Sequence, residues 1–329
     1  KFKAYPKRND FKDFAGVSRD VVERRYPGGF AALKTAALAT GELQDIILDV
    51  SSLSDDYRIS VEKILKKYKR FIITTAVANS PVNTKFLSAL RTYCKHEDAA
   101  LIILPSIMRG NDEKWTIDPE LRNECIITSD YKFNSNVGVL GIANNSKSTD
   151  PISGLPRLGK RNGSFICASP KQNMKVVPTG ISKLPHIMMS TGAVTKPNYT
   201  KGMFMQSKQD LLADNDHVTG AVIVELDTNE LFHIRPVNAD RSGGFADLGS
   251  YYAEGKKSAY APEALVSGDW HVGETDQVVV KSKLELLSRL KINKLIVHDL
   301  FDGKSLNPHE REKLLLLAKR AQKGELDLD

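Results

Sequence analysis

Two short apolar runs, each followed by histidine and aspartate, constrain the fold of this chain more than any other feature. Asp269-Trp270-His271 follows the run 264–266, and His298-Asp299 follows the run 295–297. Between them, apolar residues recur at near-helical spacing over 278–290. The pattern predicts a strand, a helix and a strand. The 30 residues from the first aspartate to the last are about the length of one βαβ unit.

A crossover of this kind makes its two strands parallel and neighbouring. Both polar clusters would then lie past the carboxyl ends of the strands, where open α/β sheets place their ligand sites. Asp269, His271 and Asp299, with Asn307 further on, offer mixed oxygen and nitrogen ligands. Such a set suits Mn²⁺, Fe²⁺ or Zn²⁺, and a carboxylate between two sites can bridge two ions. The alternative is a coincidence in solvated loops, which are rich in both residue types.

Composition places the chain among ordinary soluble proteins. Its 329 residues suggest two or three domains, and 41% hydrophobic with 26% charged residues is average. No apolar run approaches the roughly 18 residues of a membrane span, and no signal-peptide core is found at the start. Three widely spaced cysteines predict reduced thiols in a cytosolic protein. Because the chain starts with lysine and stops abruptly after GELDLD, we expect it to be part of a longer polypeptide.

Basic residues are concentrated at the N-terminus. The net charge is +7, and residues 1–34 hold nine Lys or Arg against four acidic residues. Two short helices are predicted on either side of Pro27-Gly28-Gly29, the first capped by Ser18 and the second running over 30–38. This is either a helix-turn-helix that contacts DNA or a helical hairpin packed on the next domain. In the first case the DNA-contacting side chains are Arg19, Arg24, Arg25 and Lys34.

From about residue 45 the pattern becomes α/β. Strands are predicted at 46–50, 71–76 and 100–104, the last ended by Pro105, with helices at 61–69 and from the polar turn 78–83 to Tyr93. The turn either caps the helix or holds a phosphate, and we favour the cap. Strand-and-loop material follows over 106–200.

Two features of the second half need separate mention. Residues 220–226 and 230–235 predict a β-hairpin, flanked by His217 and His233, which we expect to be structural. The turn-rich segment 190–199 either contacts phosphate through its hydroxyls and Lys196 or is a loop held by side-chain to backbone hydrogen bonds.

The segment 264–310 resembles the start of a calcineurin-like metallophosphoesterase, particularly of the DNA-repair nuclease type. That family begins with Asp-x-His after a strand, and Asp269 and His271 match it between Gly268 and Gly273. Asp299 matches the bridging aspartate of the second motif, although His298 stands where the family usually has glycine. Asn307 and His309 are similar to the family's Asn-His pair, but Pro308 separates them. The family's later histidines have no counterpart in the chain.

Residues 185–310 also resemble the pre-early, host-DNA-degrading nucleases of T5-like phages, through "STGAVTKPNY", "GAVIVELDTNELFHIRPV", "GDWHVGETD" and "HDLFDGKSLNPHE". The resemblance implies a deoxyribonuclease with two divalent ions, Mn²⁺ first and Mg²⁺ second, acting in the infected bacterium's cytoplasm. In it, Asp269, His271, Asp299 and Asn307 are metal ligands, His309 is the general acid, and His298 and Asp302 orient ligands. Self-association and binding to other phage early proteins are left open.

The predicted fold class is therefore α/β, in three parts: a small helical module at 1–44, a central α/β domain at 45–260, and the first part of a metallophosphoesterase domain with βαβ units at 261–329. Two rival functions are kept. One is a DNA- or protein-binding scaffold with an incomplete phosphatase-like segment, and the other is a metallophosphatase acting on small phosphoesters.

Overall fold

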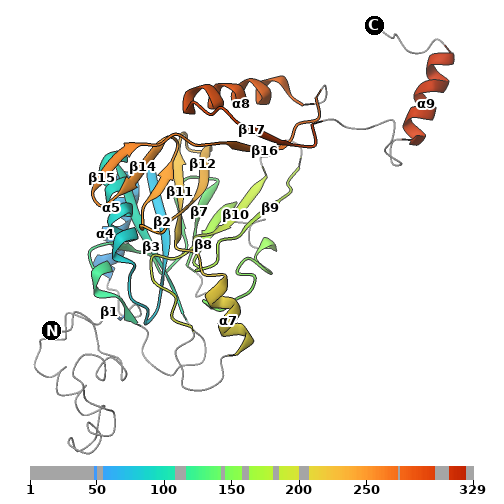
Figure 1. Ribbon diagram of the computed structural model, residues 1–329. Helices are drawn as coiled ribbons and strands as arrows, with labels where there is room; N and C mark the ends of the chain where they lie inside the picture. The colour runs from blue at the N-terminus through green and yellow to red at the C-terminus, as the bar shows by residue number, and fades with distance from the viewer. Residues whose placement is uncertain are drawn as a thin grey trace, which may run out of the picture. The chain divides into compact units, whose positions relative to one another are not determined.

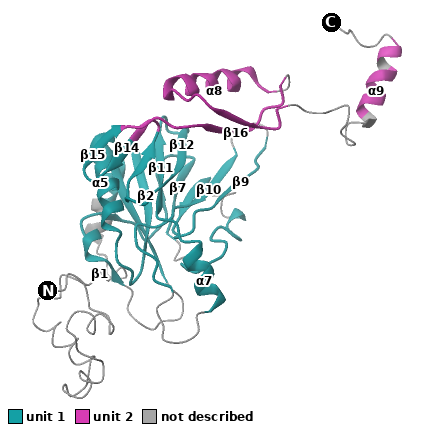
Figure 2. Ribbon diagram, in the orientation of Figure 1, with its two compact units in different colours: residues 1–247, 251–258 teal, residues 248–250, 259–329 magenta. Residues whose placement is uncertain are grey.

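The chain forms two compact units in the computed structural model. The first comprises residues 1–247 and 251–258, and the second comprises 248–250 and 259–329 (Figure 2). The helical module expected at 1–44 lies outside the described residues. The structure describes residues 48–49, 55–107, 116–141, 145–157, 163–180, 185–199, 207–272, 275–300 and 311–323.

The α/β class predicted from the sequence is confirmed, and Figure 1 shows the arrangement of the elements. Short strands β1 (Leu48–Asp49) and β4 (Thr116–Ile117) pair with each other outside the main sheets. A 3₁₀ turn, η2 (Pro119–Leu121), follows β4, and the small sheet β13 (Phe245–Asp247), β14 (Ser250–Ala253) and β15 (Lys256–Ala259) comes after the hairpin.

The first large sheet is built around a predicted βαβ unit. Its strand order is β12-β11-β2-β3-β5, and β2, β3 and β5 are parallel whereas β11 is antiparallel to its neighbours. The helix α5 begins at the predicted cap, because the Asn83 side chain accepts a hydrogen bond from the Phe86 N–H. The strands and helices are β2 (Arg70–Val77), α5 (Thr84–Glu97), β3 (Ala99–Ser106), β5 (Cys125–Ile126), β11 (Gly220–Leu226) and β12 (Phe232–Asn238).

The prediction that Pro105 ends its strand was wrong. Pro105 lies within β3, opposite Ala76 of β2. The missing N–H of Pro105 does little harm there. On the side of β3 away from β2, the strand β5 pairs only with Ile102 and Ile103, so β5 does not need a hydrogen bond from residue 105.

The second large sheet has the order β6-β7-β8-β10-β9, in which β7, β8 and β10 are parallel. It faces the first sheet across an apolar layer that includes Phe71, Ile102, Val139, Ile166 and Val224. Helix α4 (Asp55–Lys67) adds Val61 and Leu65 to this layer. The strands are β6 (Tyr131–Lys132), β7 (Val137–Leu140), β8 (Ser164–Cys167), β9 (Met174–Val177) and β10 (His186–Ser190).

The chain after β10 leaves the second sheet and joins the first. Ala193 forms bridges with Thr75 at the end of β2 and with Thr219 just before β11. Gly192 makes this crossing possible, because its φ is +80° and a Cβ there would lie 3.1 Å from backbone atoms of Gly220. One segment therefore ties the two sheets together.

The outer face of the first large sheet is also covered. Helix α5 contributes Phe86, Leu90 and Tyr93 to a cluster with Ile103 and Ile223 of the first sheet. At the edge of this cluster, Arg235 pairs with Glu225 and with Asp247, and Arg70 pairs with Glu225 and Glu97. Burial alone would raise the pKa of Glu225, but its hydrogen bonds and attraction to Arg235 hold it below the ordinary range. Glu225 is therefore an ionised partner in a half-buried network.

The second unit contains the predicted strand, helix and strand. Strands β16 (Leu265–Asp269) and β17 (Leu295–His298) are parallel neighbours, joined by α8 (Gln277–Leu290). The helix has no buried side chain, and Val278 and Leu284 are 72% and 53% exposed. Helix α9 (Arg311–Gln322) follows.

Candidate metal centre

The loops that follow β16 and β17 are bonded to each other through their backbones. The Trp270 N–H donates to the carbonyls of both His298 and Asp299, at 3.1 Å each. The His271 N–H donates to Asp299 O at 3.0 Å, and the Val272 N–H donates to Leu300 O at 3.0 Å. The parallel pairing of the strands thus continues into the loops and fixes where their side chains emerge.

Two residues of these loops have left-handed backbone conformations. The φ angles are 41° at His271 and 44° at Asp299. A non-glycine residue in this region costs free energy, on the order of 1 kcal/mol or more, and such residues cluster at functional sites. The strain is a local cost of turning both side chains at the strand ends.

Asp269, His271 and Asp299 come together in space. One ligand atom from each lies within 4.8 Å of the others. The site is open, since the side chains are 56%, 36% and 61% exposed respectively. Beside it, a Cβ built on Gly268 would meet no atom within 4 Å, which leaves room next to Asp269.

His298 contacts both aspartates. Its Nδ1 lies 2.8 Å from Asp269 Oδ1 and 3.8 Å from Asp299 Oδ2. The hydrogen bond from His298 holds the pKa of Asp269 below its usual range, and the same bond raises the pKa of His298. Asp269 is therefore an ionised carboxylate held by a hydrogen-bond donor.

The donor set fits a divalent ion. Two carboxylates and an imidazole are ligands that borderline divalent metals accept. His271 Nδ1 is also shielded from solvent and has no hydrogen-bond partner among the described residues. No described side chain therefore satisfies this ring nitrogen.

Several residues predicted to belong to the site cannot be placed. Asn307, His309 and Asp302 lie outside the described residues, as do the proposed DNA contacts Arg19, Arg24, Arg25 and Lys34. Their roles stay predictions.

One neighbour of the site was not anticipated from the sequence. Lys283 of α8 places its Nζ 4.9 Å from the ring centroid of Trp270, the residue between Asp269 and His271. The tryptophan was visible inside the Asp-x-His motif, but pairing it with a lysine 13 positions later required the packing of α8 against the strands.

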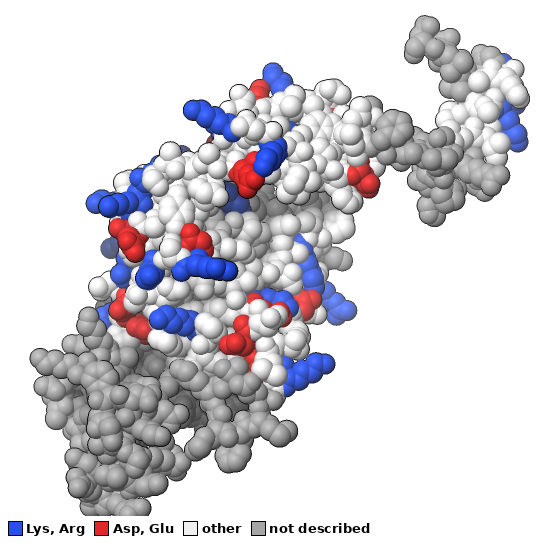
Figure 3. Space-filling view, in the orientation of Figure 1, with Lys and Arg blue, Asp and Glu red and all other residues white. Residues whose placement is uncertain are grey.

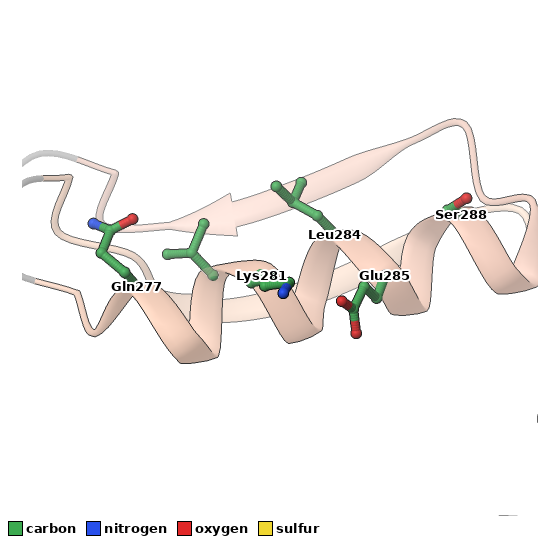
Figure 4. Close-up of a pocket in the computed structure, with 6 residues that line it drawn as sticks. Gln277, Lys281, Leu284, Glu285 and Ser288 are labelled. Carbon is green, nitrogen blue, oxygen red and sulfur yellow. The ribbon is translucent and has the colours of Figure 1, made fainter.

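A hollow in this unit is separate from the cluster. It follows the outward side of α8, where Figure 4 shows its lining side chains. None of Asp269, His271 and Asp299 lines it. Its lining residues are Gln277, Val280, Lys281, Leu284, Glu285 and Ser288.

The segment 190–199 is held by hydrogen bonds in the structure. The hydroxyls of Thr75 and Thr191 are 2.6 Å apart, and the Val77 N–H donates to Thr195 Oγ1. His217 Nε2 lies 2.8 Å from Thr195 O, and its Nδ1 lies 2.9 Å from Tyr199 Oη. Burial lowers the pKa of His217, so it is a neutral structural residue in this setting.

The visible surface carries charges of both signs. On the face drawn in Figure 3, lysine and arginine alternate with aspartate and glutamate over the described part of the chain. None of the described helices combines the length and the apolar character needed to traverse a lipid bilayer.

Fold and site together define an α/β chain whose parallel βαβ unit carries an Asp-x-His cluster suited to a divalent metal. No protein-family model matches the chain. It is 27% identical to Protein A1 of Escherichia phage T5, in an alignment of 336 positions that covers 93% of this chain and 56% of the phage protein. The chain thus spans about half the length of that relative.

Among solved structures, the crystal structure of Chaetomium thermophilum Vps29 aligns with a TM-score of 0.29 and 12% sequence identity. The alignment covers 58% of this chain and 98% of Vps29. A TM-score this low carries no argument about the fold or the function of the chain.

Proposed function

We propose that this chain supplies part of the metal centre of a phage deoxyribonuclease that hydrolyses DNA phosphodiesters. The observation that carries the proposal is the convergence of Asp269, His271 and Asp299 at the carboxyl ends of two parallel strands. The Asp-x-His resemblance and the likeness to a phage T5 protein support it.

Each residue has a distinct part in this proposal. Divalent ions at such a site, Mn²⁺ or Mg²⁺, supply Lewis acidity and lower the pKa of water. Asp269 and His271 would hold one ion, and Asp299 has two oxygens with which to bridge to a second. His298 keeps Asp269 ionised and oriented through the 2.8 Å contact. His309 remains the expected proton donor to the leaving 3′ oxygen, and Asn307 an expected ligand.

The biological setting belongs to the same proposal. A phage enzyme of this kind would meet host DNA in the bacterial cytoplasm. Its basic N-terminal residues would bind the DNA backbone by charge, and this binding would weaken as salt rises.

The test is cleavage of supercoiled plasmid by the full-length protein with Mn²⁺, with Mg²⁺ and with EDTA. We expect Mn²⁺-dependent conversion to nicked and linear forms, and we expect Asp269→Asn to reduce it to the EDTA level. Asp276→Asn is the matched control, since Asp276 caps α8 outside the cluster and asparagine caps equally well. Full cleavage by Asp269→Asn would sink the assignment.

A DNA- or protein-binding scaffold is the second candidate. It is favoured by the small number of candidate metal ligands that converge, which is three among the described residues. It predicts salt-dependent DNA binding without cleavage under any metal. A small-molecule phosphatase, by contrast, predicts hydrolysis of p-nitrophenyl phosphate that is insensitive to competing DNA.

A further inference from the structure

The loops of the metal centre carry apolar side chains as well as ligands. Trp270 is half-buried between Asp269 and His271. Val272 and Leu300, whose backbones are bonded to each other, are 58% and 55% exposed. Ligand sites are typically lined by apolar and aromatic groups with a few fixed polar ones. Trp270, Val272 and Leu300 provide such apolar groups around the open cluster.

Trp270 is the aromatic member of the three. Its backbone N–H is shared between the carbonyls of His298 and Asp299, so the backbone of Trp270 cannot move without breaking these hydrogen bonds. Lys283 lies over its ring at 4.9 Å, which adds a cation–π attraction and puts a positive charge next to the indole. An aromatic ring next to a cation is the combination with which proteins hold unpaired nucleotides, by base stacking and by attraction to the phosphate.

We propose that Trp270, with Lys283 beneath it, is a stacking contact for an unpaired nucleobase next to the metal centre, and that the chain prefers single-stranded DNA at this site. The inference rests on the proposed function in that the ligand is DNA. It goes beyond it by naming the strand form and the residue that selects it. Trp270 is a positioning residue, because it holds the substrate and does not touch the reacting atoms.

The experiment measures binding in EDTA, where no metal-dependent cleavage occurs. The chain has two tryptophans, so Trp115→Phe leaves Trp270 as the single indole reporter. We expect its fluorescence to be quenched by a short single-stranded deoxyoligonucleotide. We expect much weaker quenching by the duplex of the same length and none by an oligonucleotide whose residues are abasic.

Variants separate stacking from a structural effect. Fluorescence anisotropy of a dye-labelled oligonucleotide measures binding by the variants that lack this indole. Trp270→Ala should weaken binding of the single strand by roughly 5- to 150-fold, and Trp270→Phe should restore most of it. Neither change should alter the affinity for the abasic strand, whereas general damage to the unit would weaken both. Lys283→Met should weaken binding, and Lys281→Met on the outward side of α8 is its matched control (Figure 4).

The outcomes are decisive in both directions. No quenching of Trp270 by single-stranded DNA, or equal quenching by the abasic strand, overturns the inference even if the plasmid is cleaved. Base-dependent quenching in the chain, together with no DNA cleavage by the full-length protein, supports the inference and contradicts the nuclease. The two proposals therefore fail separately.

Discussion

His298 Nδ1 lies 2.8 Å from Asp269 Oδ1, and the two residues are also register partners across the β16–β17 pair. The hydrogen bond therefore does not depend on a flexible loop, because both backbones are set by the strands. A histidine that holds a metal-binding carboxylate in this way fixes the direction of its free oxygen.

Replacing His298 by alanine should weaken Mn²⁺ binding by about 10- to 100-fold, the range usual for groups that orient metal ligands. Isothermal titration calorimetry on the 329-residue chain measures it. His233→Ala, an exposed histidine of β12, is the control and should bind as the parent does. An unchanged dissociation constant in His298→Ala would show that the contact does not prepare Asp269 for a metal.

Arg235 is the second residue to test, by stability. Its side chain is 20% exposed and pairs with Glu225 and with Asp247, which is 7% exposed. Arg235→Met removes the arginine that pairs with poorly solvated Asp247 and leaves Glu225 with Arg70 alone, so it should cost about 3 kcal/mol in the free energy of unfolding. Urea denaturation measures this. Lys66→Met removes an exposed pair with Glu62, 3.9 Å long, and should change stability by less than about 0.5 kcal/mol.

His217 predicts a dependence of stability on pH. Its pKa in the folded chain is lowered by burial, while the unfolded chain has an ordinary value of about 6.5. The folded state thus binds fewer protons, so the contribution is complete above about pH 6.5 and is lost as pH falls below it. His217→Gln keeps an N–H for Thr195 O and an acceptor for Tyr199. Its urea midpoint should fall less between about pH 7.5 and pH 5.5 than that of the parent. An identical fall in both proteins would contradict the assignment.

Gly192 and Gly255 form a matched pair for the crossing segment. Both have positive φ, +80° and +79°, but a Cβ on Gly192 would lie 3.1 Å from Gly220 backbone atoms, whereas one on Gly255 meets nothing within 4 Å. Gly255→Ala should cost about 1 kcal/mol from the backbone alone. Gly192→Ala should cost more, since the crossing segment must also move away from Gly220 at the start of β11. Thermal unfolding compares them, and equal losses would mean that the close approach is unimportant.

Local pattern was enough to predict the elements that carry the candidate site. The strand, helix and strand over 264–298, the βαβ unit around α5 and the hairpin of β11 and β12 all follow from residue periodicity and turn residues. Asp269, His271 and Asp299 could be expected to meet because parallel strands place their carboxyl ends together.

Long-range packing was not accessible in the same way. Nothing in the local pattern of β11 indicates that it lies antiparallel beside β2, or that the chain leaves one sheet for the other after Ser190. Apolar spacing predicted the helix α8 but not the exposure of Val278 and Leu284, because periodicity defines an apolar stripe without saying how much of it two strands can cover. The cation–π contact of Trp270 likewise depends on where α8 packs.

The crossing from β10 into the first sheet has a consequence for the order in which the protein is made. The hydroxyls of Thr75 and Thr191 meet across 116 residues of chain, and Thr74 bonds to Gly220 across 146. On a ribosome, β2 therefore emerges on the order of ten seconds before the crossing segment and β11, with which it pairs. For that time the nascent chain holds an unpaired apolar strand edge, the kind of surface that chaperones bind. The layer between the sheets closes only when translation has passed the hairpin.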